Sequence, residues 1–261
     1  MKLLVLQFLI LGWATAVFPD DSSNAQEIVP HHLNEQETLE VKQKLEAFDQ
    51  GNVALDGITE NSESDMKLIE YYLSSTNNVT TRMKLPISKS FAIWSQYPRA
   101  AQLAQDYVNV YSNDWRGWSI LAGSKIMLKS YDEAIAAYTN AIRLGDEKNC
   151  LGLGIAALAV DRIDILEKIV VPRLLVQMNE TDEFPEKKRN QMRGCIIGYA
   201  FKSDKKGIFI RAVTGVDFSK IYQWPELENL ITLGCKKFKG PDIDKIRQEL
   251  ESANSVSSPA H

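Results

Sequence analysis

The fold is decided by residues 114–148, whose sequence is DWRGWSILAGSKIMLKSYDEAIAAYTNAIRLGDEK. Apolar residues recur there at intervals of three and four in two successive segments, which predicts two amphipathic helices joined by a tight turn. Trp118, Leu121 and Ala122 share one stripe of the first helix. Neither helix can bury its apolar face alone, so the sequence predicts further helices packed on both sides.

Polar residues mark the ends of both predicted helices. Asp114 is a suitable N-cap for the first helix, because its carboxylate accepts hydrogen bonds from free backbone N–H groups. Ser130 and Glu133 have the spacing of a capping box, which predicts that the second helix begins at Tyr131. Gly145 is suited to the left-handed position that ends a helix. We therefore expect a complete helical hairpin within these residues.

The spacing of large and small side chains in this hairpin resembles that of a tetratricopeptide repeat, W-x₂-L-G-x₂-Y followed by A-x₃-F and a later Ala. The residues that match are Trp118, Leu121, Ala122, Ala134, Tyr138 and Ala141. Two positions depart from the pattern: Lys125 replaces an aromatic residue, and Asp146 replaces the closing proline. The resemblance covers residues 115–148 and implies one unit of a helical repeat.

The flanking sequence contains weaker copies of the same unit. One repeat length upstream, Tyr97 and Ala100 align with Tyr131 and Ala134, and a partner helix is expected from Pro86. Downstream, helices are expected at 151–160, at 163–170 with Asp161 as cap, after Pro185, and at 205–213 with Asp204 as cap. Pro172 is expected to end or kink the second of these. The sequence thus predicts one clear repeat and two or three degenerate ones.

These elements predict an all-α fold of antiparallel helical hairpins, stacked as a short tetratricopeptide-like α-solenoid with N-terminal and C-terminal capping helices. The expected capping helices are 35–48 and 65–73 before the repeats, and 225–238 and 241–254 after them. The predicted divisions are a signal peptide at 1–16, a flexible tether at 17–33, an N-terminal helical region with a linker at 34–80, a repeat domain at 84–222, capping helices at 223–254 and a disordered tail at 255–261.

The N-terminus predicts export from the cytoplasm. Lys2 precedes an apolar stretch that ends in Ala14-Thr15-Ala16, and this order is typical of a secretory signal peptide. An uncleaved signal anchor is the alternative. No later segment is apolar over enough residues to span a bilayer, so no integral membrane span is expected after cleavage. The sequence therefore predicts an extracytoplasmic protein, either secreted or periplasmic.

The charge balance argues against a nucleic-acid-binding protein. The formal net charge is −4, whereas binding to phosphate requires a positive field. A local basic cluster nevertheless occurs, and it is either a solvated helix face or a patch for an anionic partner. Its members are Lys187, Lys188, Arg189, Arg193, Lys202, Lys205 and Lys206.

Cysteines and glycosylation sequons give little information about function. Cys150, Cys195 and Cys235 are widely spaced in apolar helical segments, so three buried thiols are expected and at most one disulfide can form. Asn78 and Asn179 begin N-x-T sequons, which matter only in a eukaryotic secretory pathway.

The sequence contains no catalytic motif in a valid context, and we expect a non-enzymatic protein without cofactor or metal. The histidines are His31 and His32 in the tether and His261 at the last position, outside the predicted folded body. Residues 152–157 match the dinucleotide fingerprint G-x-G-x-x-A, but a polar turn precedes them where a buried strand is required. We expect these glycines to allow close helix packing instead.

The resemblance also implies where a ligand binds, because the first helix of each tetratricopeptide unit lines a concave groove. The corresponding residues here are Arg116, Ser119, Gly123, Ile126 and Met127. They lack the Lys and Asn that clamp a peptide carboxylate in some members of the family, while Arg116 offers a charge and Met127 an adaptable apolar surface. The alternative is that these residues pack against a neighbouring helix.

We therefore expect a scaffold or adaptor protein that binds a protein or peptide partner in its concave groove. A second hypothesis is a glycan-binding protein or an enzyme acting on extracellular polymers, with Trp94, Tyr111 and Trp115 in the groove. A third is a purely structural subunit of a secreted or envelope assembly. An apolar and basic groove would favour the first hypothesis, and exposed aromatic and carboxylate side chains would favour the second.

Overall fold

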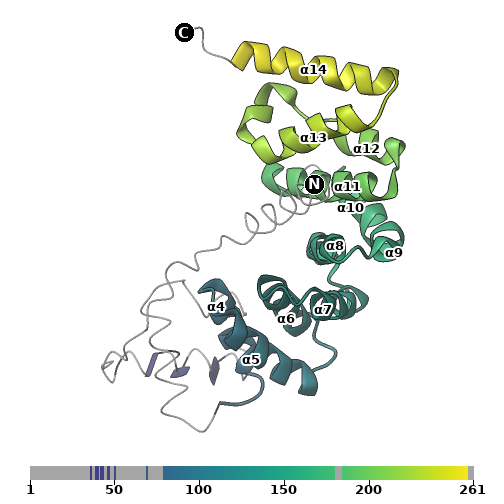
Figure 1. Ribbon diagram of the computed structural model, residues 1–261. Helices are drawn as coiled ribbons and strands as arrows, with labels where there is room; N and C mark the ends of the chain where they lie inside the picture. Colours follow the sequence, from purple (N-terminus) through teal and green to yellow (C-terminus); the bar gives the residue numbers. More distant parts are fainter. Residues whose placement is uncertain are drawn as a thin grey trace. The chain divides into compact units, whose positions relative to one another are not determined.

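The computed structural model describes residues 79–179 and 184–257, together with scattered positions between 36 and 69. All regular structure in these residues is helical, which confirms the all-α prediction (Figure 1). The predicted signal peptide, the tether, all three histidines and Asn78 lie outside the described residues. Of the predicted N-terminal helices, the few described positions are helical, and Ile69 is buried.

The chain divides into two compact units, with the boundary between Gly152 and Leu153. We call the described residues up to Gly152 the N-terminal unit and those from Leu153 to Ser257 the C-terminal unit. The boundary falls inside the predicted 84–222 domain. Each hairpin of a helical repeat packs mainly against its neighbours in sequence, so such a chain has no obligatory single core.

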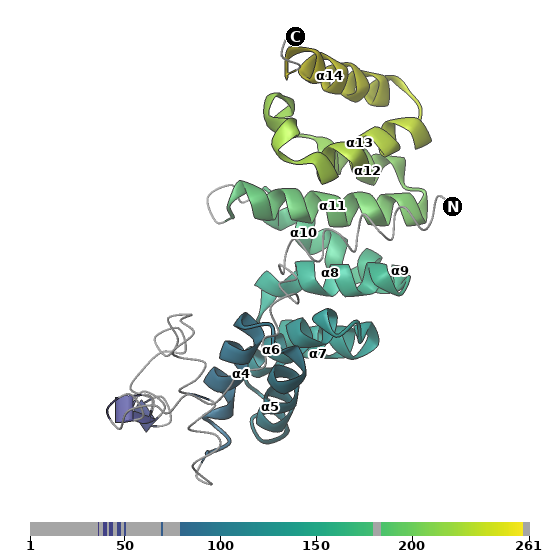
Figure 2. The ribbon, with the colours of Figure 1, turned by 60° about the vertical axis from the view of Figure 1, so that its left-hand side comes forward.

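The N-terminal unit contains two consecutive hairpins. They are formed by α4 (Lys84–Ile93), α5 (Tyr97–Val110), α6 (Trp115–Met127) and α7 (Tyr131–Arg143). Each helix packs against the next, and α4 also contacts α6 (Figures 1 and 2). The core of this unit includes Phe91, Ala104, Ala122 and Ala141, all fully buried. A short 3₁₀ turn, η3 (Glu147–Asn149), leads to α8 (Cys150–Ala159), which spans the boundary.

The C-terminal unit continues with helices in successive layers (Figure 2). Its elements are α9 (Ile163–Ile165), η4 (Leu166–Val170), α10 (Val171–Gln177), α11 (Glu186–Ser203), α12 (Lys206–Val213), η5 (Phe218–Gln223), α13 (Pro225–Lys237) and α14 (Pro241–Ser257). Both α12 and α13 pack on α11, while α14 contacts α12, α13 and η5. Ile243 and Leu250 of α14 point inward as predicted, with 0% and 5% of their surface exposed.

Four hairpins share the same turn between their two helices. A residue one or two positions after the first helix lies in the left-handed region, with φ of 60°, 59°, 58° and 56° at Ser95, Lys129, Asp161 and Asp204. The next N–H group donates to the carbonyl five residues earlier, at 2.8 to 3.0 Å in all four turns. This is the Schellman pattern of hydrogen bonding. The four hairpins therefore share the geometry of their connecting turns.

A second feature recurs between hairpins, where an aromatic ring from one hairpin packs on a glycine of the next helix. A Cβ atom at Gly117 would lie 2.6 Å from the Tyr107 ring, one at Gly152 would lie 2.4 Å from Tyr138, and one at Gly234 would lie 2.0 Å from Phe209. Since such distances are shorter than any van der Waals contact, only glycine fits at the three positions. The glycines therefore set how closely successive helices approach.

Several predicted caps need correction. Asp114 caps α6 as expected, accepting from the Arg116 N–H at 3.0 Å. The capping box at Ser130 is wrong, because its side chain makes no capping bond and Glu133 pairs with Lys125 at 2.6 Å.

The caps predicted at Asp161 and Asp204 are wrong as well. Both residues occupy the left-handed position that follows the preceding helix, and the next helices are capped at Arg162 and Lys205 without a side-chain bond. The Schellman turn places its left-handed residue directly before the N-cap of the next helix, so each aspartate lies one residue before the cap position.

Pro172 does not end the run of helical backbone, although it lies in the first turn of α10, just after η4, and donates no backbone hydrogen bond. The backbone is helical from Ile163 to Gln177, with a π-helical segment at η4, where the Val171 N–H donates to the Leu166 carbonyl. In an α-helix the proline ring would clash with the carbonyl four residues earlier. The wider π turn displaces that carbonyl, so the helix continues through the proline.

The C-terminal helix is longer than predicted. It runs to Ser257, whereas a disordered tail was expected from residue 255. Within this last turn the Ser255 hydroxyl donates to the Ser252 carbonyl at 2.8 Å. Residues 258–261 lie outside the described residues.

Candidate functional site

The five residues predicted to bind a partner lie on α6, and Arg116 stands at its beginning. Its guanidinium donates to both carboxylate oxygens of Asp114, at 2.8 Å from Nε and 2.6 Å from a terminal nitrogen. Burial of Asp114 raises its pKa, but hydrogen bonds from Arg116 and Tyr107 outweigh this and hold the pKa below its usual value. Arg116 is therefore half-exposed but already bound to a carboxylate of the same chain.

The other four predicted residues are occupied to different degrees. The Ser119 hydroxyl donates to Asp146, which is buried and also accepts from Asn149 at 2.5 Å. Gly123 faces the Tyr138 hydroxyl, and Ile126 is only 3% exposed. Met127 is half-buried. Arg116, Ser119 and Met127 are thus partly exposed, and of these Arg116 and Ser119 already make polar contacts to the same chain.

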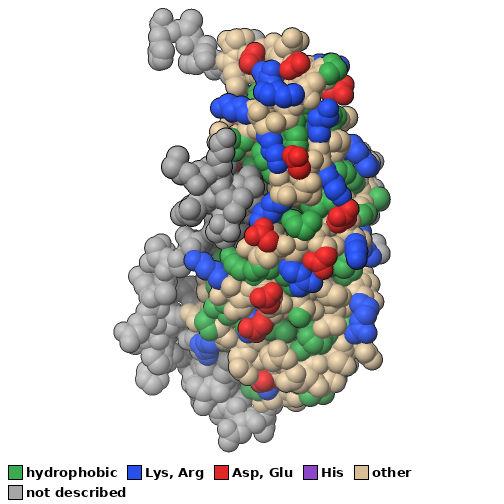
Figure 3. Space-filling model, turned by 45° about the vertical axis from the view of Figure 1, so that its right-hand side comes forward, with side chains coloured by type: hydrophobic (Ala, Val, Ile, Leu, Met, Phe, Trp, Pro, Cys, Tyr) green, Lys and Arg blue, Asp and Glu red, His purple; other side chains and the backbone are tan. Residues whose placement is uncertain are grey.

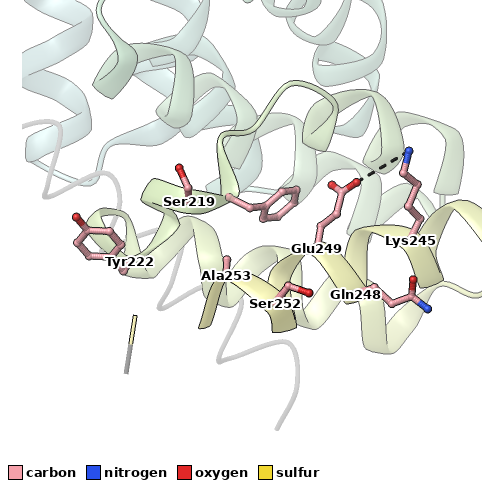
Figure 4. A pocket seen from close by; sticks show the side chains of 8 residues that line it. Ser219, Tyr222, Lys245, Gln248, Glu249, Ser252 and Ala253 are labelled. Carbon is pink, nitrogen blue, oxygen red and sulfur yellow. Dashed lines mark ion pairs between the residues drawn. The ribbon is translucent and has the colours of Figure 1, made fainter. Parts of the chain in front are cut away.

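A larger groove lies in the C-terminal unit, between η5 and α14. It has a volume of about 1030 Å³ and is lined by Phe218, Ser219 and Tyr222 of η5 and by Lys245, Gln248, Glu249, Ser252 and Ala253 of α14. Figure 4 shows Ser219 and Tyr222 on one side and the residues of α14 on the other. The groove is open to solvent rather than enclosed.

The chemistry of this groove combines aromatic and polar groups. Tyr222 is 57% exposed, which leaves its ring free to pack on a ligand. Along α14, Lys245 and Glu249 form a long ion pair of 4.0 Å (Figure 4). Asp217 caps η5 by accepting from the Ser219 N–H at 3.1 Å, which fixes the aromatic segment beside α14. We refer to this site as the η5–α14 groove.

Sequence reasoning did not find the η5–α14 groove. The helical period predicted α14 and its inward residues, but the six residues of η5 are too few to show a period. The available signal was the density of aromatic residues, since Phe218, Tyr222 and Trp224 fall within a short polar segment. Nothing in the sequence indicated that this segment lies beside a helix that begins at Pro241.

A smaller aromatic surface lies where α5 leads into α6. Tyr111 and Trp115 are 40% and 41% exposed, and Tyr111 stacks on Tyr107 with ring centroids 4.9 Å apart. The Trp118 indole donates to the Ser112 carbonyl at 2.9 Å and so holds the loop against α6. Trp94, also expected in a groove, is half-buried at the end of α4. The structure thus brings Tyr111 and Trp115 to one corner.

The motif at 152–157 lies within α8, preceded by the 3₁₀ turn η3. A dinucleotide site requires this motif at a turn from a strand into a helix. Its glycines instead face other helices: Gly152 contacts Tyr138, and a Cβ atom at Gly154 would lie 2.5 Å from the Cys195 sulfur. The expectation that these glycines serve helix packing is confirmed.

The basic cluster does not form one surface patch. Arg193 is buried and donates to Asn190 at 3.0 Å and to the Gly215 carbonyl at 3.1 Å, while Lys202 pairs with Asp161 and Lys205 with Glu167. On the face drawn in Figure 3, basic and acidic side chains alternate along the described surface. The three cysteines are buried thiols, as expected.

Two further searches concern metals and membranes. In residues 79–179 and 184–257, no group of three His, Cys, Asp or Glu side chains is arranged to hold a metal ion. Over the same part of the chain, none of the helices has the length and apolar character needed to cross a bilayer.

Comparison with known proteins gave no relatives: no protein-family model matches the chain, and no curated protein matches it.

Proposed function

We propose that this chain is an extracytoplasmic, tetratricopeptide-like helical-repeat protein that binds an extended segment of a protein or peptide partner. The observation that carries the proposal is the η5–α14 groove, an open channel of about 1030 Å³ in a chain built from repeated hairpins. Helical-repeat proteins use extended surfaces of this kind for binding. The signal-like N-terminus supports a location outside the cytoplasm.

The chemistry of the groove suits a peptide with an apolar anchor and polar flanks. The Tyr222 ring supplies the exposed aromatic surface, and aromatic rings contribute most of the binding energy at many interfaces. Gln248 and Ser252 supply hydrogen-bonding groups that can orient a backbone. Lys245 and Glu249 carry opposite charges on the rim, so neither sign of partner charge is favoured strongly.

The test is a selection of displayed random peptides against the purified chain, followed by measurement of the selected peptides' affinities. The variant Tyr222→Glu/Ser252→Glu places two charges in the η5–α14 groove and should weaken binding at least tenfold, a change of about 1.4 kcal/mol. The matched control, Asn229→Glu/Lys239→Gln, makes the same change of net charge at exposed positions outside the groove and should leave binding unchanged.

A third variant separates this groove from the site predicted on α6. Arg116→Gln/Met127→Glu alters the charged and the apolar residue of that site, both partly exposed; glutamine is used because a glutamate at 116 would face Asp114. Loss of binding in this variant alone would transfer the function to α6. If neither Tyr222→Glu/Ser252→Glu nor Arg116→Gln/Met127→Glu weakens binding, the proposal of a groove-binding protein is contradicted.

The aromatic corner of Tyr111 and Trp115 favours glycan binding as a second candidate function. Exposed aromatic rings supply flat apolar surfaces, and the half-buried Asp114 lies between them in sequence. This candidate predicts that soluble polysaccharides retard the chain in affinity electrophoresis and that Tyr111→Ala/Trp115→Ala abolishes the retardation. Equal mobility with and without polysaccharide would contradict it.

A further inference from the structure

A second cavity lies in the C-terminal unit, away from the residues that line the η5–α14 groove. It has a volume of about 410 Å³ and is formed by η4, α10, α11 and α12. Its apolar wall consists of Val171, Pro172, Leu175, Val176 and Ile208. Val176 is 59% exposed, which is unusual for an aliphatic side chain beside a concave surface. The cavity thus offers an aliphatic surface in the size range of small-molecule sites.

The polar side of the same cavity is formed by Glu167, Asn179, Tyr199, Lys205 and Arg211. Lys205 forms an ion pair with Glu167, and its ammonium lies 5.5 Å from the centre of the Tyr199 ring. Tyr199 also interacts with Glu167, so these three side chains satisfy one another. Arg211 lines the cavity as well, is exposed, and forms no ion pair with any residue that the structure describes. The lining therefore carries one uncompensated positive charge.

The backbone explains why this cavity exists. The π segment of η4 contributes Glu167, and the proline that it accommodates, Pro172, forms part of the apolar wall. A π turn adds a residue to the helical turn and widens it, which is why such segments are frequent at binding sites. The segment occurs here on the wall of a cavity that has both an apolar side and a cationic side.

We propose that this cavity binds an aliphatic anion, with its alkyl chain against Leu175, Val176 and Ile208 and its anionic head at Arg211. A neutral alkyl chain would leave the Arg211 charge without a counterion, and a cation would be repelled by it. The Lys205–Glu167 pair stays intact and provides a polar edge beside the head group. A carboxylate and a phosphate monoester share the chemistry that this site recognises.

The test is isothermal titration of the purified chain with four probes of equal chain length: octanoate, octyl phosphate, octan-1-ol and octylammonium. We expect octanoate or octyl phosphate to bind about fivefold more tightly than octan-1-ol, and octylammonium to bind least. The ratio of the two anions identifies the head group. Equal binding of octylammonium and octanoate would overturn the proposal, as would no binding of any probe.

Two variants locate the site. Arg211→Gln should reduce the affinity for octanoate to that for octan-1-ol, and Val176→Asp should weaken both. Lys168→Gln removes a charge from an exposed residue of η4 that does not line the cavity, and it should change neither affinity. Circular dichroism and melting curves verify that each variant is folded. If Arg211→Gln and Lys168→Gln behave alike, the anion is not bound at Arg211.

Discussion

The hairpin of α6 and α7 and the hairpin of α11 and α12 have the same turn but very different sequences. Lys129 and Asp204 have φ of 59° and 56°, and the following N–H groups donate to the carbonyl five residues earlier at 2.9 and 3.0 Å. Only the first hairpin carries the spacing that resembles a tetratricopeptide unit. The shared structure must therefore depend on features that the motif does not include.

The common features are the turn and the contact with the next helix. Tyr138 of the first hairpin packs on Gly152, and Phe209 of the second packs on Gly234. Both aromatic rings come from the second helix of their hairpin, and both glycines belong to the helix that follows it. The comparison indicates that an aromatic ring against a glycine, rather than the whole motif, keeps successive hairpins together.

The largest expected effect comes from removing the two rings. Tyr138→Ala and Phe209→Ala should each lower the free energy of unfolding by about 3–5 kcal/mol, because each leaves a cavity against a glycine that cannot fill it. Urea unfolding measures the loss, and hydrogen exchange shows which hairpin opens. Tyr138→Phe is the control and should cost about 1 kcal/mol or less. A loss below about 1 kcal/mol for either alanine variant would show that the two contacts are not equivalent.

The next effect distinguishes the two hairpins, since only the first is closed by a buried carboxylate. Asp146 accepts from Ser119 and Asn149. Asp146→Ala leaves these donors unsatisfied and should cost about 1–3 kcal/mol.

Asp132→Ala, at an exposed position in the first turn of α7, is the matched control for this loss. It should cost about 0.5 kcal/mol. Urea unfolding measures both losses. If Asp146→Ala and Asp132→Ala cost the same, Asp146 has no special role in stabilising the first hairpin.

The same contrast explains what the sequence could predict. The positions of the helices could be predicted from the hydrophobic period. The start of the helix at Pro241 and the Asp114 cap could be predicted from the residue types preferred at helix ends. The contact of Gly234 with Phe209 could not be predicted in this way, because it joins residues from different helices. The η5–α14 groove was missed for that reason too: its two sides are separated in sequence, and one is too short to show a period. Of the residues predicted on α6, Ser119 is bound to Asp146, a contact that depends on tertiary packing.

A smaller effect tests the two helix starts within the first hairpin. Asp114→Ala removes a capping bond and an ion pair and should cost about 1–2 kcal/mol at neutral pH, whereas Ser130→Ala removes no capping bond and should cost about 0.5 kcal/mol or less.

The loss of stability expected for Asp114→Ala depends on pH in a defined direction. The pKa of Asp114 is lowered in the folded chain from its ordinary value of 3.8. Its contribution is therefore complete above that value and is lost as the pH falls through the lower folded pKa. We expect the free energies of unfolding of wild type and Asp114→Ala, measured with urea, to differ less at pH 3 than at pH 7. A constant difference would show that the charge of Asp114 does not stabilise α6.

The smallest effect concerns the shared turn itself. A left-handed backbone costs a non-glycine residue about 1 kcal/mol, part of which is offset because glycine also makes the unfolded chain more flexible. Lys129→Gly should therefore stabilise the chain by about 0.5 kcal/mol. Asp204→Gly should gain less, because aspartate tolerates this conformation and Asp204 pairs with Lys237 at 3.1 Å. Thermal melting measures both variants. A larger gain at Asp204 than at Lys129 would mean that the two turns, although alike in φ and hydrogen bonding, are strained to different degrees.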